Sequence, residues 1–160
     1  MNRRSWIAWV AICCAVFAFA GVARAASQHG PFLEISIIYA TQSDAGASID
    51  PALKDLPQLT REQPFTRYNV YKLLDRKQFP LEPNKAVTFV LPNGRTLQAT
   101  LTAVTVEKNE KRYQLETKIG DPGKQAFLNS LQVKASENEP FFVGGQSYKG
   151  GMMFLELMVK

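Results

Sequence analysis

The alternation of apolar and polar residues constrains the fold of this chain most. In the segment RYQLETKI, residues 112–119, the apolar side chains of Tyr113 and Leu115 are separated by polar ones. A period of two residues predicts a strand with one face in the core and one face in solvent. The same pattern recurs in residues 33–39 and 97–101. Repeated segments of this kind predict a mainly β fold.

Turn signals and further apolar runs extend this interpretation. Asn93-Gly94 lies between AVTFVL and RTLQATL, and Asn-Gly between two strands is the strongest short signal for a hairpin. After Leu101 the apolar residues change parity, which predicts a β-bulge near Ala103. Further strands are expected at Phe127 to Ala135, Pro140 to Val143 and Met152 to Val159.

One helical signal interrupts the strands. Asp50 before Pro51 is typical of a capping residue followed by proline at the first helical position, with Leu53 and Leu56 on one face. Pro57 limits such a helix to one or two turns.

The next segment, residues 65–74, fits either period, and we interpret it as a strand. Together these elements predict a mainly β fold, an antiparallel sandwich or partly open barrel of seven or eight strands with one short helix.

The amino end has the layout of a secretory signal peptide. Arg3 and Arg4 precede the apolar run from Ile7 to Val22, and small residues flank Arg24. We expect a signal peptide at 1–25, cleavage after Ala25, and one β-rich domain at 26–160 in the periplasm or outside the cell. A retained membrane anchor is the alternative. A lipoprotein is less favoured, because Cys13 and Cys14 lie inside the apolar run.

Few residues of the mature chain offer catalytic or metal chemistry. It has no cysteine, and its one histidine, His29, lies close to the expected mature amino end. A zinc site or a Ser-His-Asp triad cannot be built on that residue alone. Asp44 and Asp50 lack the alternating oxygen ligands of a calcium loop. We therefore predict no metal and no cofactor, and contact with the membrane only during export.

The segment from Arg61 to Lys77 combines basic and aromatic residues. This composition suits single-stranded nucleic acid, but export argues against that partner. An anionic glycan, a lipid headgroup or another envelope protein fits better, unless the tyrosines belong to the core. The interaction candidates here are Phe65, Arg67, Tyr68 and Tyr71.

The stretch FFVGGQSYKGGMMFLELMV, residues 141–159, contains two glycine pairs. Lysine precedes a glycine and apolar strand-like sequence follows, so the stretch does not match a phosphate-binding loop. A hairpin bend is the favoured interpretation, because glycine supplies the positive φ that such turns require. Four glycines exceed that need, which leaves an interaction role open. The candidates for it are Gly144, Gly145, Tyr148, Lys149, Gly150 and Gly151.

Glu156 is an acid surrounded by the apolar residues 154–158. Burial would raise the pKa of this carboxyl and make it a candidate catalytic acid. More often such a residue lies on the solvated face of an edge strand or pairs with a lysine, and we favour that interpretation.

Three segments carry a resemblance. ENEPFFVGGQSYKGGMMFLELMV, IDPALKDL and VLPNGRTLQATL together resemble an uncharacterised group of small exported bacterial β-rich proteins. PFFVGG is also similar to the VGG segment of secretins, the outer-membrane pores of secretion systems, although this chain is far too short to be a secretin. The resemblance implies an envelope location and assigns no catalytic residue.

These features lead us to expect a non-enzymatic exported binding or assembly module of the bacterial cell envelope. The alternative is a carboxylate-dependent hydrolase that acts on cell-wall glycan. A pair of carboxylates in one cleft would favour the hydrolase, whereas an exposed sheet edge or apolar patch would favour the binding module.

Overall fold

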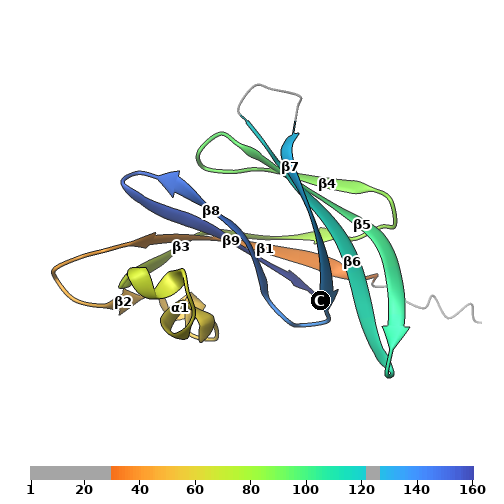
Figure 1. Cartoon of the computed structure of the whole chain (residues 1–160), viewed down its shortest axis with the longest axis horizontal. Coiled ribbons are helices and arrows are strands. Elements are labelled where there is room, and N and C mark those ends of the chain that lie inside the picture. The colour runs from red at the N-terminus through yellow and green to blue at the C-terminus, as the bar shows by residue number, and fades with distance from the viewer. Residues whose placement is uncertain (1–29, 122–126) are drawn as a thin grey trace, which may run out of the picture.

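The structure of this chain is a computed structural model that describes residues 30–121 and 127–160. The expected signal peptide, its cleavage site and His29 lie outside these residues. Figure 1 shows the strands, the short helical segment and the long hairpin that β5 and β6 form. The elements are β1 (Phe32–Thr41), β2 (Ser48–Ile49), η1 (Pro51–Leu53), α1 (Gln58–Arg61), η2 (Phe65–Arg67), β3 (Val70–Pro80), β4 (Ala86–Val90), β5 (Thr96–Glu107), β6 (Glu110–Gly120), β7 (Phe127–Ser136), β8 (Phe141–Tyr148) and β9 (Gly151–Val159).

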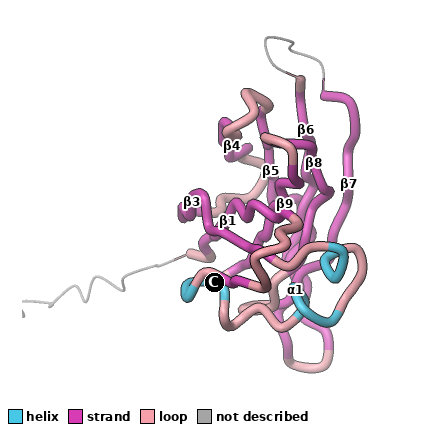
Figure 2. The backbone as a smooth tube through the Cα atoms, turned by 90° about the vertical axis from the view of Figure 1, so that its left-hand side faces the viewer, coloured by secondary structure: helices cyan, strands magenta, loops and turns pink. Residues whose placement is uncertain are grey.

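The strands form two sheets. The five-stranded sheet has the order β2-β3-β1-β9-β8, and the four-stranded sheet has the order β4-β5-β6-β7. All named strand pairs are antiparallel except β2 with β3. Figure 2 shows that strands account for most of the described chain. The mainly β, sandwich-like fold is therefore confirmed. Among the described residues the strand beyond the expected seven or eight is β2, which has two residues.

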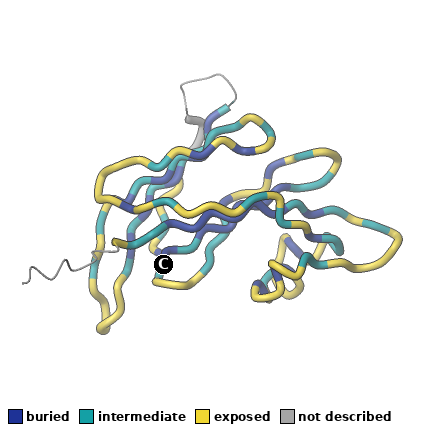
Figure 3. The backbone as a smooth tube through the Cα atoms, turned by 180° about the vertical axis from the view of Figure 1, so that it is seen from behind, coloured by how far each residue is buried: buried dark blue, intermediate teal, exposed yellow. Residues whose placement is uncertain are grey.

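The inner face of the five-stranded sheet packs on the four-stranded sheet. Leu33, Ile35 and Ile37 of β1 lie in one apolar cluster with Leu155 and Leu157 of β9. Strands β4, β5 and β6 contribute Phe89, Leu97 and Leu115 to the same cluster. Figure 3 shows buried positions alternating with more exposed ones along several strands. This inter-sheet core is the burial that the period of two residues predicts.

Two bulges interrupt the strand pairing. The register of β5 with β6 shifts between Leu101 and Ala103, which confirms the bulge predicted near Ala103. The register of β1 with β3 shifts between Ile37 and Ile38, where β3 has the extra residue. Because β1 has no extra residue there, its side chains keep alternating, and Ile38 and Ala40 face the side opposite Ile37. One strand therefore supplies apolar side chains to two cores.

Residues 50–69 form a helical arm that covers part of the outer face of the five-stranded sheet. The Asp50 carboxylate accepts a hydrogen bond from the Ala52 N–H, as the capping pattern predicts. Leu53 and Leu56 of the arm pack with Ile38 and Phe154 of the sheet in a second core. None of the helices in the described parts of the chain is long and apolar enough to span a membrane.

Two details of the arm differ from the sequence prediction. Residues 65–74 are not one strand, because Phe65–Arg67 form a 3-10 turn and β3 begins only at Val70. Phe65 and Tyr71 are buried in the second core, so their spacing reflects packing on the sheet. The chain also turns helical again at Gln58–Arg61, because Pro57 is compatible with the position just before a helix.

Candidate functional site

The glycine-rich stretch near the carboxyl end is the β8–β9 hairpin. Tyr148 pairs with Gly151, and the two residues between them, Lys149 and Gly150, have φ values of 46° and 78°. Positive φ at both central residues defines the type I′ turn that two-residue hairpins prefer. The hairpin interpretation is confirmed. Gln146 lies within β8 and is buried, so it is not a tip residue.

Each remaining glycine of the two pairs has a structural reason. Gly144 has a φ of 52° at the bulge between Val143 and Gly145. A Cβ at Gly145 would lie 3.0 Å from the sulfur of Met152. A Cβ at Gly151 would lie 2.4 Å from the carbonyl oxygen of Ala40. The surplus of glycines is therefore explained by the bulge and by two close approaches.

Tyr148 and Lys149 are held by Tyr39 of β1. The rings of Tyr148 and Tyr39 meet edge to face with centroids 6.0 Å apart, and the Tyr39 hydroxyl donates to the Lys149 carbonyl at 3.0 Å. The Lys149 ammonium is exposed and lies 5.3 Å from the centre of the Tyr148 ring. Only Lys149 of this pair is a freely accessible tip residue.

The basic and aromatic candidates of the arm are separated by the fold. Phe65 and Tyr71 are buried, and Tyr68 packs edge to face on Phe154. The Tyr71 hydroxyl donates to the Phe65 carbonyl, and burial, with a smaller effect of Tyr68, raises the pKa of Tyr71 to about 12. Arg67 is exposed. The aromatic side chains of this segment belong to the second core, which is the alternative that the sequence left open.

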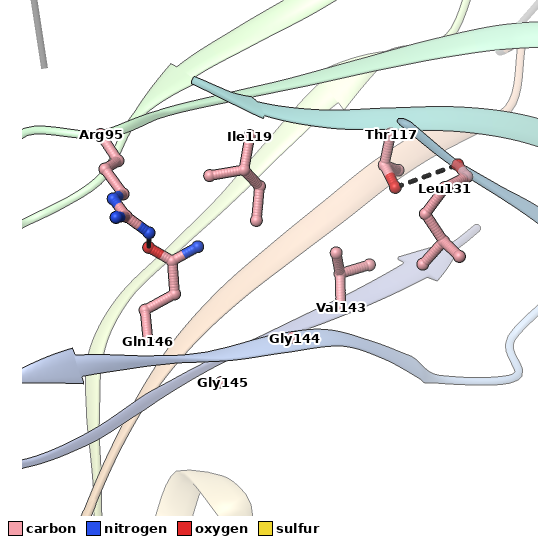
Figure 4. Close-up of a pocket in the computed structure, with 8 residues that line it drawn as sticks. All are labelled: Arg95, Thr117, Ile119, Leu131, Val143, Gly144, Gly145 and Gln146. Atoms are coloured by element: carbon pink, nitrogen blue, oxygen red, sulfur yellow. Dashed lines mark hydrogen bonds between the residues drawn. The ribbon is translucent and has the colours of Figure 1, made fainter. Parts of the chain in front are cut away.

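Gly144 and Gly145 line a cleft of about 300 Å³ at the side of the sandwich, which we call the open-edge cleft. Figure 4 shows its apolar side chains, Ile119, Leu131 and Val143, between β6 and β7 on one side and β8 on the other. Leu131 is 46% exposed. The cleft therefore offers apolar contact at an accessible position.

The polar end of the open-edge cleft is a fixed network. The side-chain oxygen of Gln146, Oε1, accepts hydrogen bonds from Arg95 Nη1 and from Asn93 Nδ2, both at 3.0 Å. Arg95 also forms an ion pair with Asp121 at 3.3 Å. Asn93 belongs to the β4–β5 turn, so this network ties that turn to β8. Sequence reasoning identified Asn93 as a turn residue and did not identify Arg95. Neither contact with Gln146 was predictable, because each joins residues more than 50 positions apart.

A second concave site lies on the outer face of the five-stranded sheet, between the helical arm and the turn that joins β7 to β8. We call it the outer-face groove, and its volume is about 280 Å³. Its charged and polar lining residues are Glu34, Asp55, Arg76, Asn138, Glu156 and Lys160. The register places Glu34 and Ser36 of β1 on the same face as Glu156 of β9, because Ser36 is directly opposite Glu156.

Glu34 is a buried carboxylate with two partners. Its Oε2 accepts a hydrogen bond from Lys160 Nζ at 2.8 Å and another from Gln78 Nε2 at 2.7 Å. Burial alone would raise the pKa of Glu34, but these hydrogen bonds and the charges of Lys160 and Arg76 outweigh it. The pKa of Glu34 is therefore lowered, and the group remains an anion at neutral pH.

Glu156 is only 2% exposed, and its Oε2 accepts no hydrogen bond from the described residues. It lies on β9, between β1 and β8, so it is not on an edge strand. The expectation of a solvated edge position is wrong, because the strand order was not readable from the sequence. A buried carboxylate oxygen without a partner costs free energy.

Arg76 completes the groove. Its Nε donates to Ser36 Oγ at 3.0 Å, and its Nη2 donates to the Ala52 carbonyl at 3.1 Å. Among the described residues no carboxylate lies within ion-pair distance of this guanidinium, and no cluster of three metal-ligating side chains is placed to hold a metal ion. Sequence reasoning did not single out Glu34, a polar residue on an alternating strand, or Arg76, one basic residue of the segment from Arg61 to Lys77.

Comparison with models of protein families, with characterised proteins and with solved structures finds no match to this chain. The chemistry of the open-edge cleft and of the outer-face groove is therefore the ground on which a function is assigned.

Proposed function

We propose that this chain is a non-enzymatic exported binding or assembly module of the bacterial cell envelope, and that it binds an extended segment of an envelope protein along β8. One observation carries this proposal: the open-edge cleft adjoins a strand at the end of its sheet. No described strand pairs with the outer edge of β8. Such an edge offers a row of backbone donors and acceptors to a partner strand.

The lining of the cleft suits the side chains of an added strand. Alternate side chains of an extended segment point to one face, so some would enter the cleft while the backbone pairs with β8. Ile119, Leu131 and Val143 would contact apolar side chains of the partner. The exposed fraction of Leu131, 46%, provides the accessible apolar surface. Lys149, at the end of the same hairpin, would contact the rim of the interface.

The proposal is tested by photo-crosslinking in the cells that make the protein. A crosslinking amino acid replaces Leu131 in one variant and Val104 in a matched control, since both side chains are 46% exposed and only Leu131 lines the cleft. We expect one envelope protein to be crosslinked from position 131 and not from position 104. We also expect the protein to fractionate with the periplasm or the medium.

Three results would contradict the proposal: equal crosslinking from both positions, crosslinking only to glycan or lipid, or retention of the protein in the cytoplasm. A further variant, Leu131→Glu, places a charge in the cleft without disturbing a buried position. It should abolish crosslinking from a probe at exposed Ser147 of β8, whereas Val104→Glu should not.

A specific observation favours the hydrolase as a second candidate function. Glu34 and Glu156 are diagonal neighbours on adjacent strands, which places their Cβ atoms about 7 Å apart. The catalytic carboxyl groups of glycoside hydrolases are separated by roughly 5–10 Å. If the chain is a hydrolase, purified cell-wall glycan gains new reducing ends in its presence, and both Glu34→Gln and Glu156→Gln abolish this release. Intact glycan after incubation with the folded protein would eliminate this candidate.

A further inference from the structure

We propose that the outer-face groove binds a small zwitterion, a molecule of the amino acid class, with its ammonium group at Glu156 and its carboxylate at Arg76. This inference does not depend on the partner proposed for β8, because the open-edge cleft and the groove share no lining residue.

The state of Glu156 is the first argument. The protein buries this carboxylate almost completely and gives its Oε2 no hydrogen-bond donor among the described residues. Glu156 Oε2 has almost no solvent-accessible surface, so a ligand in the groove reaches this unsatisfied acceptor through a small movement of the Glu156 side chain. An ammonium group supplies both the opposite charge and up to three N–H donors.

Glu34, the neighbouring acid, has no such free acceptor at its Oε2. Oε2 of Glu34 already accepts from Lys160 and Gln78. Lys160 is consequently engaged with Glu34 and does not neutralise Glu156. Of the two groove carboxylates on the sheet, Glu34 therefore has donors and Glu156 Oε2 has none, while Asp55 is exposed on the arm. Glu156 is the anionic contact for a ligand.

Arg76 supplies the complementary cationic contact. Its two hydrogen bonds, to Ser36 Oγ and to the Ala52 carbonyl, use two of the five guanidinium N–H groups and pair it with no described carboxylate. A ligand carboxylate is the group that a guanidinium fork binds best. Arg76, Ser36 and Glu156 lie in one row across β3, β1 and β9. Two strand spacings separate the ends of that row by about 10 Å at the backbone, and both side chains are long enough to converge on one small molecule.

The size and the donor set of the groove restrict the ligand class. A volume of about 280 Å³ lies at the lower limit of ordinary ligand pockets and suits a molecule of amino-acid size. A metal ion is disfavoured, since the described residues form no group of three or more metal-ligating side chains. A free amino acid and the amino-acid end of a larger molecule present the same two groups.

Isothermal titration calorimetry with defined probes tests the proposal. Lysine carries both groups, and Nε-acetyllysine retains them while its blocked tail imitates attachment to a larger molecule. Cadaverine lacks the carboxylate, and hexanoate lacks the ammonium group. We expect binding of lysine and weaker binding of both cadaverine and hexanoate, because each of these two probes retains only one of the two contacts. Nε-acetyllysine binding at least as tightly as lysine would identify the end of a larger molecule as the source, and weaker binding would identify the free amino acid.

Variants separate the two contacts. Glu156→Gln should raise the Kd for lysine and for cadaverine at least about tenfold, the loss expected for one charge-assisted hydrogen bond. Arg76→Gln should raise the Kd for lysine by a similar factor and leave that for cadaverine unchanged. The controls Glu62→Gln and Arg67→Gln remove the same charges at exposed positions outside the groove and should bind like the parent protein.

Amide chemical shifts of the parent protein locate the bound probe without any substitution. Lysine should shift the amide resonances of Glu156 and Asn138 in the groove and leave that of Leu131 in the open-edge cleft unchanged. The proposal is overturned if no probe binds, if hexanoate binds as tightly as lysine, or if Glu156→Gln retains the parent affinity. It is also overturned if a crystal structure with lysine shows Arg76 and Glu156 paired with each other.

Discussion

The two faces of the five-stranded sheet follow different physical rules. On the inner face, Leu155 of β9 packs among Ile35 and Ile37 in an apolar core. On the outer face, the next residue, Glu156, is equally enclosed but carries an unpartnered carboxylate oxygen. Burial of an apolar side chain stabilises the fold, whereas burial of an unpaired carboxylate oxygen destabilises it. The difference indicates that the inner face maintains the structure and that part of the outer face is retained for another role.

The largest expected effect comes from the inner face. Leu155→Ala should lower the free energy of unfolding by about 2–5 kcal/mol, because Leu155 is fully buried and the substitution leaves a cavity. Urea denaturation measures this loss. Leu131→Ala, at a 46% exposed position, is the control and should cost much less. Equal losses at the two positions would contradict the assignment of the inter-sheet core.

The β8–β9 hairpin packs closely against β1 at Gly151. Gly151→Ala should lower the free energy of unfolding by about 1–3 kcal/mol, because its Cβ would lie 2.4 Å from the backbone oxygen of Ala40. Gly30→Ala is the matched control, since Gly30 has no positive φ and no atom within 4 Å of the position of the added Cβ. If the hairpin moves aside freely, Gly151→Ala will cost no more than Gly30→Ala.

A substitution on the outer face should raise the free energy of unfolding instead of lowering it. Glu156→Leu should raise the free energy of unfolding by about 1–2 kcal/mol, because it replaces an unpartnered buried carboxylate with an apolar side chain of similar size. The same denaturation assay measures the gain, with Glu62→Leu at an exposed position as the control. A loss of stability in Glu156→Leu alone would mean that the carboxylate is satisfied in solution.

The smallest effect concerns Glu34 and depends on pH. The pKa of this group is lowered on folding from an ordinary value of 4.5, so its ionised form stabilises the protein above that pH. The stabilisation is lost as the pH falls below 4.5 and through the lowered pKa. Unfolding of the parent protein and of Glu34→Gln should therefore differ most near neutral pH and converge in acid. A difference that stays constant from neutral pH into acid would contradict the lowered pKa.

The local features of the fold were predictable from the sequence. The Asn93-Gly94 turn, the bulge near Ala103 and the Asp50 cap each depend on a few neighbouring residues, and each is present. The hairpin at Lys149-Gly150 is present for the same reason. Residues 65–74 were misassigned, because both periods fit the segment and only packing on Phe154 decides between them.

The candidate sites were less accessible to sequence reasoning. Gly144 and Gly145 were identified as candidates, and they line the open-edge cleft, but the facing Leu131 and Arg95 come from β7 and from the β4–β5 turn. Glu34 was interpreted as the solvent-facing residue of an alternating strand, and Arg76 as one basic residue of the segment from Arg61 to Lys77. They became parts of a groove because β1 is central in its sheet and because the helical arm and the β7–β8 turn flank its outer face.

Thermal unfolding of the parent protein and of Glu156→Leu, each with and without lysine, tests the central claim most directly. The account predicts that Glu156→Leu melts at the higher temperature without lysine, and that saturating lysine raises the melting temperature of the parent protein alone. The carboxylate would then be shown to reduce stability and to bind the ligand. A parent protein that melts above Glu156→Leu without lysine, and does not respond to it, would contradict the account.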